Sequence, residues 1–510
     1  MSVNRSRLYP AILAVALGLG IGIARGADAT AASLAASNDS STQSMQQKID
    51  QLEAKVEALE AKQTQTTAAS DAATVQQMQA DADKHSQLLD PTTGTSGYDP
   101  ATGFHISSDD GNFFLHPWAL AQFRGVINDR QSISTTGANG GTVVPASGSP
   151  ETDGFEIHHV FLGLNGHVVT PNLQYFLDID VPSGNTATAN VPNRGGAETL
   201  QDAYMTYRIA DGSPWIIKAG QFVDPVWHES NVDDGHLLAG DRSLAGVLLG
   251  GNTGLNNGAE RLEGVGFQYQ TEEFHGEFDL TNGYGTANSP FYNSNPVVNG
   301  SPTNFGWSGR TEFKLIGDNT AWDAYNSLSA MGDKTDSLIG GFGFEWTEAA
   351  NFDNIFLTLD GQYATANGLS IYGALLEDYA DWSDTPGGNK VPKANAGTFP
   401  NFGGIIQAGY MLTPQWEPFV RYDVSIMNSK FANILAFGAK NAPVANQKAT
   451  ANSHEFTAGV NYYLFGQRAK VTGDLSFLPN GSPIDAPGLG ILANQNHSEW
   501  VGRVQFQLSL

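Results

Sequence analysis

Apolar and polar residues alternate along most of the chain, with a period of two rather than the period of a helix. In residues 200–210, Ala203, Met205 and Tyr207 share one face of an extended strand, whereas Asp202 and Arg208 share the other. This pattern is typical of a strand with one face toward apolar surroundings and the other toward water. No sustained helical period follows Phe113. The remainder of the chain is therefore predicted to be all-β.

Sixteen segments carry this pattern, and an even number suits a closed antiparallel barrel. The predicted strands are 113–128, 154–169, 173–181, 199–209, 214–222, 261–270, 273–282, 305–316, 337–347, 354–364, 369–379, 403–413, 415–427, 453–465, 467–478 and 498–510. Tight connections such as TPN, ADGS, TEE, TPQ and GQ alternate with long ones, as in outer-membrane barrels. Two connections depart from this scheme: 317–336 is long where a tight turn is expected, and 349–353 is short where a long loop is expected.

A soluble β-sandwich or propeller would also alternate, but it would bury its apolar face in a core. Here aromatic residues fall at strand ends, as in the interfacial girdles of membrane barrels. These residues are Trp118, Tyr207, Trp215, Trp307, Trp346, Tyr462, Tyr463 and Trp500. The outward parity carries almost no Lys or Arg, which would cost about 2–4 kcal/mol at mid-bilayer. Glu156 and His158 have outward parity near a long loop, and we expect them to lie above the hydrocarbon.

The chain before the barrel has three parts. Residues 1–29 have basic residues, an apolar run and small residues in the order of a signal peptide, and the run is too short for a membrane anchor. Residues 43–63 place apolar side chains along one helical seam, which predicts a short coiled coil that needs a preformed oligomer. The alternative is one amphipathic helix on another domain. Residues 64–112 have little apolar pattern and are predicted to be linker.

Composition narrows the partners. Charged residues are 15% of the chain, below the roughly 25% of soluble domains, and the formal net charge is −26. An acidic chain of this kind is a poor partner for nucleic acid, which needs clustered Lys and Arg. Cysteine is absent, so neither disulfides nor Cys-based zinc sites are possible.

Six motifs, in their order along the chain, resemble the phosphate-selective porin O/P family. They are GFEIHHVFLGLNGHVVTPNLQYFLDIDV, LQDAYMTYR, IKAGQFVDP, GDRSLAG, FVRYD and EFTAGVNYYL. The resemblance covers Phe113–Leu510. It implies a 16-stranded antiparallel transmembrane β-barrel preceded by a short N-terminal coiled-coil helix. It further implies a homotrimer in the outer membrane through which small hydrophilic solutes and ions diffuse passively.

By the same resemblance, residues 223–260 are the third outer loop, which in porins folds into the lumen and narrows it. Acids and bases in a narrow passage set an electrostatic barrier for ions. Solvated loop charges are the alternative interpretation. The loop contains Asp224, His228, Glu229, Asp233, Asp234, His236, Asp241 and Arg242, and we expect it to face Arg124, Arg208 and Lys218 across the constriction.

Phosphate selectivity is not expected, although the family name implies it. On the lumen parity of the second strand, where family members commonly carry basic residues, this chain has His159, Phe161, Gly163 and Asn165. Elsewhere on that parity, acids outnumber bases. The bases are Arg124, Arg208, Lys218, Arg310, Lys314, Arg421, Lys470 and Arg503, and the acids are Asp178, Asp180, Asp202, Glu277, Asp279, Glu312, Glu345, Asp360, Asp423, Glu455 and Asp474.

The functional hypothesis is a general or weakly cation-preferring diffusion pore. One alternative is an anion- or phosphate-selective channel, or a channel specific for another single solute such as an oligosaccharide. A second is a structural tether in which the N-terminal helix reaches the cell wall. No catalytic residues, metal site or cofactor are predicted, because no GxSxG, P-loop or zinc-protease motif occurs and His228-Glu229 lacks a second His.

Overall fold

The computed structural model describes residues 51, 54–55, 94–99, 103–131, 135–136, 142–143, 150–181, 199–251, 261–283, 288, 303–349, 352–382, 396–437 and 448–510. The chain divides into two units, Met1–Leu88 and Leu89–Leu510. Within the first unit, the described residues Gln51, Ala54 and Lys55 are helical. The rest of the predicted helix at 43–63, and the predicted signal peptide at 1–29, lie outside the described residues. No helix among the described residues is both long and apolar enough to cross a membrane.

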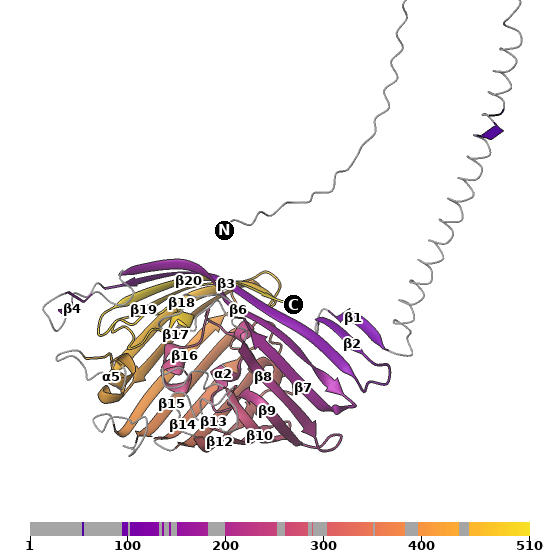
Figure 1. Cartoon of the computed structure of the whole chain (residues 1–510), viewed down its shortest axis with the longest axis horizontal. Coiled ribbons are helices and arrows are strands. Elements are labelled where there is room, and N and C mark those ends of the chain that lie inside the picture. The colour runs from indigo at the N-terminus through magenta and orange to yellow at the C-terminus, as the bar shows by residue number, and fades with distance from the viewer. Residues whose placement is uncertain are drawn as a thin grey trace, which may run out of the picture. The chain divides into compact units, whose positions relative to one another are not determined.

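The second unit is an antiparallel barrel of sixteen strands in the described part of the chain (Figure 1). Glu499–Ser509 of the last strand pairs with Leu120–Arg130 of the first, which closes the barrel. The barrel strands are β3 (Phe114–Arg130), β6 (Glu151–Val168), β7 (Thr170–Asp180), β8 (Thr199–Arg208), β9 (Trp215–Val223), β10 (Arg261–Gln270), β11 (Phe274–Thr281), β12 (Thr303–Ile316), β13 (Ser337–Ala349), β14 (Phe352–Ala364), β15 (Leu369–Trp382), β16 (Gly397–Tyr410), β17 (Trp416–Ile426), β18 (Asn452–Tyr463), β19 (Ala469–Leu478) and β20 (Glu499–Ser509).

The predicted strands match these sixteen, and the predicted barrel is confirmed. The clearest difference is at β16, which begins at Gly397 rather than at residue 403. The Gly and Pro residues around Pro400 are typical of a loop, but the register with β15 places Pro400 opposite Tyr379 inside the ladder. Pairing with a neighbouring strand therefore overrides the local loop signal.

Additional strands precede or flank the barrel. Within the predicted linker 64–112, β1 (Thr95–Asp99) and β2 (Gly103–Ser107) form a hairpin, and β2 pairs with the start of β3. The linker prediction is therefore wrong for these residues, because two five-residue strands interrupted by glycine are too short to give a clear alternation. A second small pair consists of β4 (Thr135–Thr136) and β5 (Thr142–Val143).

The two faces of the wall differ as the alternation predicts. Outward positions such as Phe267, Leu359, Ile406 and Val420 are exposed, whereas the predicted wall acids and bases face the lumen and are mostly buried there. Of the predicted girdle, Tyr207, Trp215, Trp307, Trp346, Tyr462 and Trp500 lie on outward positions. Trp118 and Tyr463 do not: Trp118 lines the lumen, and Tyr463 is buried and donates a hydrogen bond to Glu417. Their places near strand ends are as expected, but their parity turns them inward.

The ladder between β3 and β6 contains a β-bulge. Gln122 pairs with His159, and the next pair is Phe123 with Ile157, so His158 is an extra residue on β6. A bulge shifts the alternation by one residue. Glu156 and His158 therefore face the lumen, and the prediction that they face outward is wrong.

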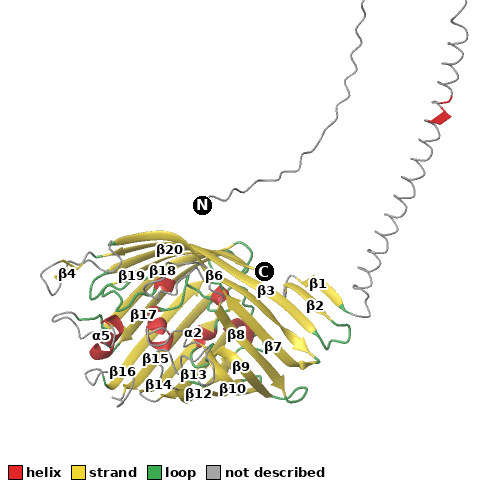
Figure 2. Cartoon of the chain, viewed as in Figure 1, coloured by secondary structure: helices red, strands yellow, loops and turns green. Residues whose placement is uncertain are grey.

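Both irregular connections are present. β13 ends at Ala349 and β14 begins at Phe352, and the long connection 317–336 carries helix α4 (Ala321–Tyr325). This long turn folds into the barrel, where the amide of Leu328 donates to the carbonyl oxygen of His236 (3.1 Å). Other short helices pack against the strands (Figure 2): α2 (His228–Asn231), η1 (Asp234–His236), α3 (Leu244–Gly246), η2 (Val247–Gly251), α5 (Ser429–Phe437) and η4 (Pro487–Leu489).

Candidate functional site

The segment 224–251, here called the inner loop, lies inside the barrel. Its apolar side chains are buried against inward-facing residues of β14–β17 and against α5. Burial of large apolar side chains stabilises this position by about 1.5–3 kcal/mol each. The loop contributes Trp227, Leu237, Leu238, Leu244 and Leu248, and the wall contributes Phe356, Tyr372, Phe399 and Phe419. One side of the lumen is therefore filled with packed side chains.

Acidic residues of the wall accept hydrogen bonds from backbone amides in the second half of the inner loop. The amide of Gly240 donates to Asp474 (3.0 Å), and the amide of Ala245 donates to Asp423 (2.9 Å). Arg503 pairs with Asp474 (2.6 Å), and Arg421 donates to the carbonyl oxygen of Asp241 (2.7 Å). These charges are nearly fully buried beneath the loop. Their role is to position the loop rather than to meet a solute.

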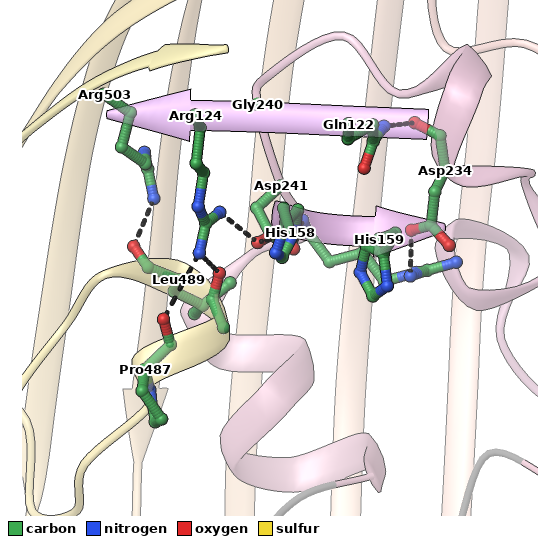
Figure 3. Close-up of polar contacts among 12 residues, drawn as sticks. Gln122, Arg124, His158, His159, Asp234, Gly240, Asp241, Pro487, Leu489 and Arg503 are labelled. Carbon is green, nitrogen blue, oxygen red and sulfur yellow. Dashed lines mark hydrogen bonds and ion pairs between the residues drawn. The ribbon is translucent and has the colours of Figure 1, made fainter. Parts of the chain in front are cut away.

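A second anchor joins the inner loop to the bulge (Figure 3). Asp241 lies 3.1 Å from Nη1 of Arg124 and 3.0 Å from Nε2 of His158. Burial favours the protonated form of Asp241, but His158 and Arg124 outweigh it and hold the pKa of this carboxyl below its usual value. Arg124 also pairs with Glu156 (2.6 Å) and donates to the carbonyl oxygen of Pro487 (3.2 Å). Arg124 is fully buried, so the expectation that it faces the constriction is wrong.

Arg242 shapes the tip of the inner loop. Its guanidinium donates to the carbonyl oxygens of Glu229 (3.3 Å) and Val232 (3.1 Å), and it pairs with Asp234 (2.5 Å). The helix α2 ends here, and a cation is favoured beside the exposed carbonyls of a helix C-terminus. The side chain of Asp233 accepts from the amide of Gly235 (2.7 Å). The tip is thus a tight, hydrogen-bonded structure.

Three predicted site residues of the inner loop have buried side chains. Asp224 accepts from the amide of Val226 (3.2 Å), and burial raises the pKa of Asp224 to about 7. Glu229 accepts from Oγ of Ser243 (2.8 Å), and burial raises the pKa of Glu229 as well. His228 stacks on Tyr325 at 3.7 Å between ring centroids, and burial lowers the pKa of His228. Asp224 and Glu229 are therefore structural residues, and His228 lines a small cavity of about 170 Å³.

A passage remains between the tip of the inner loop and the opposite wall. It is a cavity of about 730 Å³, and its lining runs along β8 from Asp202 to Arg208 and along β10 from Arg261 to Gln270. It therefore extends from the loop end of the wall to the turn end. A second cavity of about 630 Å³ lies toward the long turn and includes Ser327. Asn231 at the loop tip borders all three of these cavities.

Charged residues of both signs line the passage. Among the described residues, the acids are Asp178, Asp202, Asp233, Asp234 and Glu277, and the bases are Arg208, Lys218, Arg242 and Arg261, with His167. Several form pairs: Arg261 with Asp202 (3.3 Å), Arg242 with Asp234, and Lys218 with Glu277. The lining is close to neutral, with one more acid than permanent bases.

The passage brings together five of the predicted site residues: Asp233, Asp234, Arg242, Arg208 and Lys218. Arg124, Asp224, Glu229 and Asp241 do not line it. Sequence reasoning missed Asn231, Gln268, Gln270 and Arg261. The two glutamines were detectable, since they lie on the inward parity of β10, whereas Arg261 and Asn231 carried no such signal.

Together these features define a barrel whose lumen is narrowed by an inward-folded loop. The anion-selective porin from Comamonas acidovorans aligns with a TM-score of 0.50 at 12% identity, over 78% of this chain and 99% of that chain. OmpF of Salmonella typhi in complex with daunomycin aligns over 81% and 100% (TM-score 0.45, 12% identity). The outer membrane channel DcaP of Acinetobacter baumannii aligns over 79% and 99% (TM-score 0.46, 10% identity). The first likeness carries the assignment, and it concerns the fold alone: this is the 16-stranded porin fold.

No protein-family model matches the sequence, and no curated protein matches it.

Proposed function

We propose that the chain is an outer-membrane porin that forms a water-filled channel for passive diffusion of small hydrophilic solutes and ions. One observation carries the proposal: a passage with polar lining runs from the loop end to the turn end of a barrel whose outer face is apolar. The apolar outer face suits a bilayer, and the polar passage suits hydrated solutes.

We further propose that the channel has a weak cation preference, and that the chain is a distant relative of the phosphate-selective porin O/P family without its phosphate preference. The acids of the passage slightly outnumber its permanent bases, and among the described residues Asp233 at the loop tip pairs with His236 rather than with an Arg or Lys. On β6, Phe161 and Asn165 line the passage where the family carries bases. Such a lining gives an anion no continuous series of cations to follow.

Reversal potentials test both parts. In planar bilayers with an about tenfold KCl gradient, the purified protein is expected to conduct with a modest cation preference. Asp233→Asn removes the carboxylate at the loop tip and is expected to reduce this preference toward zero. Asp109→Asn, an exposed acid on the turn side, is the matched control and should change nothing. A strong anion preference contradicts the selectivity proposal, and absence of conductance contradicts the porin proposal.

A homotrimer is proposed as the assembled state, held in part by the helix at 43–63. Support comes from the sequence, because a seam this short requires partner helices that are already close. Attachment of this helix to the cell wall is the second candidate role, favoured by its position ahead of the barrel.

A further inference from the structure

Four wall strands, β3, β7, β8 and β9, each carry a large aromatic side chain on the lumen face. Trp118 of β3 lies 5.9 Å from Phe176 of β7 between ring centroids. Phe176 stacks on Tyr204 of β8 at 5.5 Å with an interplanar angle of 16°. Tyr204 meets Phe222 of β9 edge to face at 6.4 Å. All four side chains line the passage, and they form one continuous series, here called the aromatic track.

Two glycines lie beside the rings of the aromatic track. β6 lies between β3 and β7, and Gly163 of β6 pairs with Trp118. A Cβ atom at Gly163 would lie 2.2 Å from Cε2 of Trp118, so only glycine lets the indole reach across β6 toward Phe176. Gly220 of β9 has a φ of +137° and pairs with Tyr204, where a Cβ atom would lie 2.2 Å from the carbonyl oxygen of Ala203. Gly163 therefore makes room for the indole ring, and Gly220 allows the close approach of β9 to the backbone of β8 beside Tyr204.

The aromatic track runs along the passage from the turn end of the wall to the loop end. Trp118 is near the start of β3, which begins on the turn side, and Phe222 is the last residue but one of β9, at the start of the inner loop. β3, β7, β8 and β9 each contribute one ring, and the tilt of barrel strands turns such a series into a rising path. A solute that passes through the cavity therefore meets ring faces over most of its route.

Hydrogen-bonding groups face the passage beside the aromatic track. Asn231 and Asp233 come from the inner-loop tip, and Gln268 and Gln270 come from β10. The carboxylates and amides accept and donate hydrogen bonds, and the rings offer flat apolar faces. A ligand that fits both must be polar at its edge and apolar on its faces, and long enough to span more than one ring.

We propose that the aromatic track binds neutral linear oligosaccharides and guides them through the channel. Sugar rings present C–H faces to aromatic rings and hydroxyl groups to amides and carboxylates. The negative ring faces disfavour anions such as phosphate. For small organic cations, the face of Phe222 is already taken, because the ammonium of Lys218 lies 3.6 Å over its ring. This inference rests on the proposed channel function and specifies its solute class.

Maltohexaose block of the channel current tests the proposal. The wild-type protein in a planar bilayer in KCl is expected to show a saturable decrease in current as maltohexaose is added. Tyr204→Ala and Phe176→Ala each remove one ring and are expected to raise the apparent Kd of the block about tenfold, which corresponds to a loss of about 1.4 kcal/mol of binding free energy. Tyr207→Ala is the matched control, because Tyr207 is the same residue type on the same strand but faces outward. It should leave the block unchanged.

The outcomes separate the two proposals. Conductance in KCl without any saturable block overturns the aromatic track and leaves the porin proposal standing, whereas absence of conductance overturns the porin proposal. Block by tetramethylammonium but not by maltohexaose, lost in Tyr204→Ala, would assign the track to organic cations and so overturn the inference. A β-type circular dichroism spectrum and retained channel formation in KCl are the check that each variant has folded.

Discussion

At the scale of single residues, burial decides what each charge does. Arg421 and Arg124 were equivalent to Lys218 and Arg208 in the alternating pattern, yet the first two hold the inner loop and the last two line the passage. The alternation gives only the face of the wall. Which stretch of that face is covered depends on where the loop packs, and this depends on contacts between residues far apart in sequence. The inward parity of these charges could therefore be predicted, but their roles could not.

The pH dependence of stability tests the burial of Asp224. Its pKa is raised to about 7 by burial, so the folded protein holds this proton to higher pH than the unfolded chain does. The contribution of Asp224 to stability is then greatest below the usual pKa of aspartate and declines as the pH rises toward about 7. Asp224→Asn removes this decline, and it should raise the melting temperature relative to the wild-type protein at about pH 8 but little at about pH 4. Thermal unfolding followed by circular dichroism in detergent measures both.

A gain in melting temperature that is the same at both pH values would contradict the buried, proton-holding state of Asp224. Asp109→Asn provides the control, because this exposed acid should alter neither melting temperature.

At the scale of the elements, the strands were predictable and their exceptions were not. Sixteen strands follow from period-two alternation, because each strand is wet on one face and apolar on the other. The bulge at His158 escapes such reasoning, since an extra residue is visible only when the partner strand is known. The β1–β2 hairpin and the inward packing of the turn 317–336 were missed for the same reason: both depend on contacts with residues elsewhere in the sequence, which a local pattern does not reveal.

The outward face of β14 gives a test of the membrane boundary. Leu359 lies near the middle of this strand and is exposed. Leu359→Lys places a charge toward the lipid and is expected to lower the free energy of unfolding by about 2–4 kcal/mol. Urea unfolding in lipid vesicles measures the change. Leu359→Phe keeps the position apolar and should cost much less; equal costs for both variants would argue against lipid at this position.

At the scale of the whole molecule, the net charge and the charge of the passage are different quantities. The chain carries −26, yet the lining of the passage is nearly balanced. Local charges at a narrow point determine which ions pass, because the field of distant charges is screened beyond about 8 Å at physiological salt. Selectivity is therefore expected to follow Asp233, Arg208 and their neighbours rather than the isoelectric point.

The helix predicted at 43–63 gives a test at this scale. Deleting residues 43–63 is expected to leave single-channel conductance unchanged, because the passage lies wholly within the barrel unit. The proposed trimer should dissociate at a lower temperature in mild detergent when these residues are deleted, since linked helices raise the effective concentration of partners. Native electrophoresis after graded heating measures dissociation. Unchanged dissociation together with loss of envelope attachment would favour the cell-wall role instead.

The bulge on β6 has a consequence for how this barrel tolerates change in length. Removal of one residue from a strand normally exchanges inside for outside along everything beyond the cut. At the bulge, β6 has one residue more than the facing stretch of β3. Deletion of His158 would therefore restore regular alternation between Ile157 and His159. Phe155 would still face outward and Glu156 would still face the lumen. Without His158, the other side chains of β6 would keep their outward or lumen orientation, and only the contact between His158 and Asp241 would be lost. His158 is thus an extra residue that binds the inner loop, and the hydrogen-bonded ladder between β3 and β6 is complete without it.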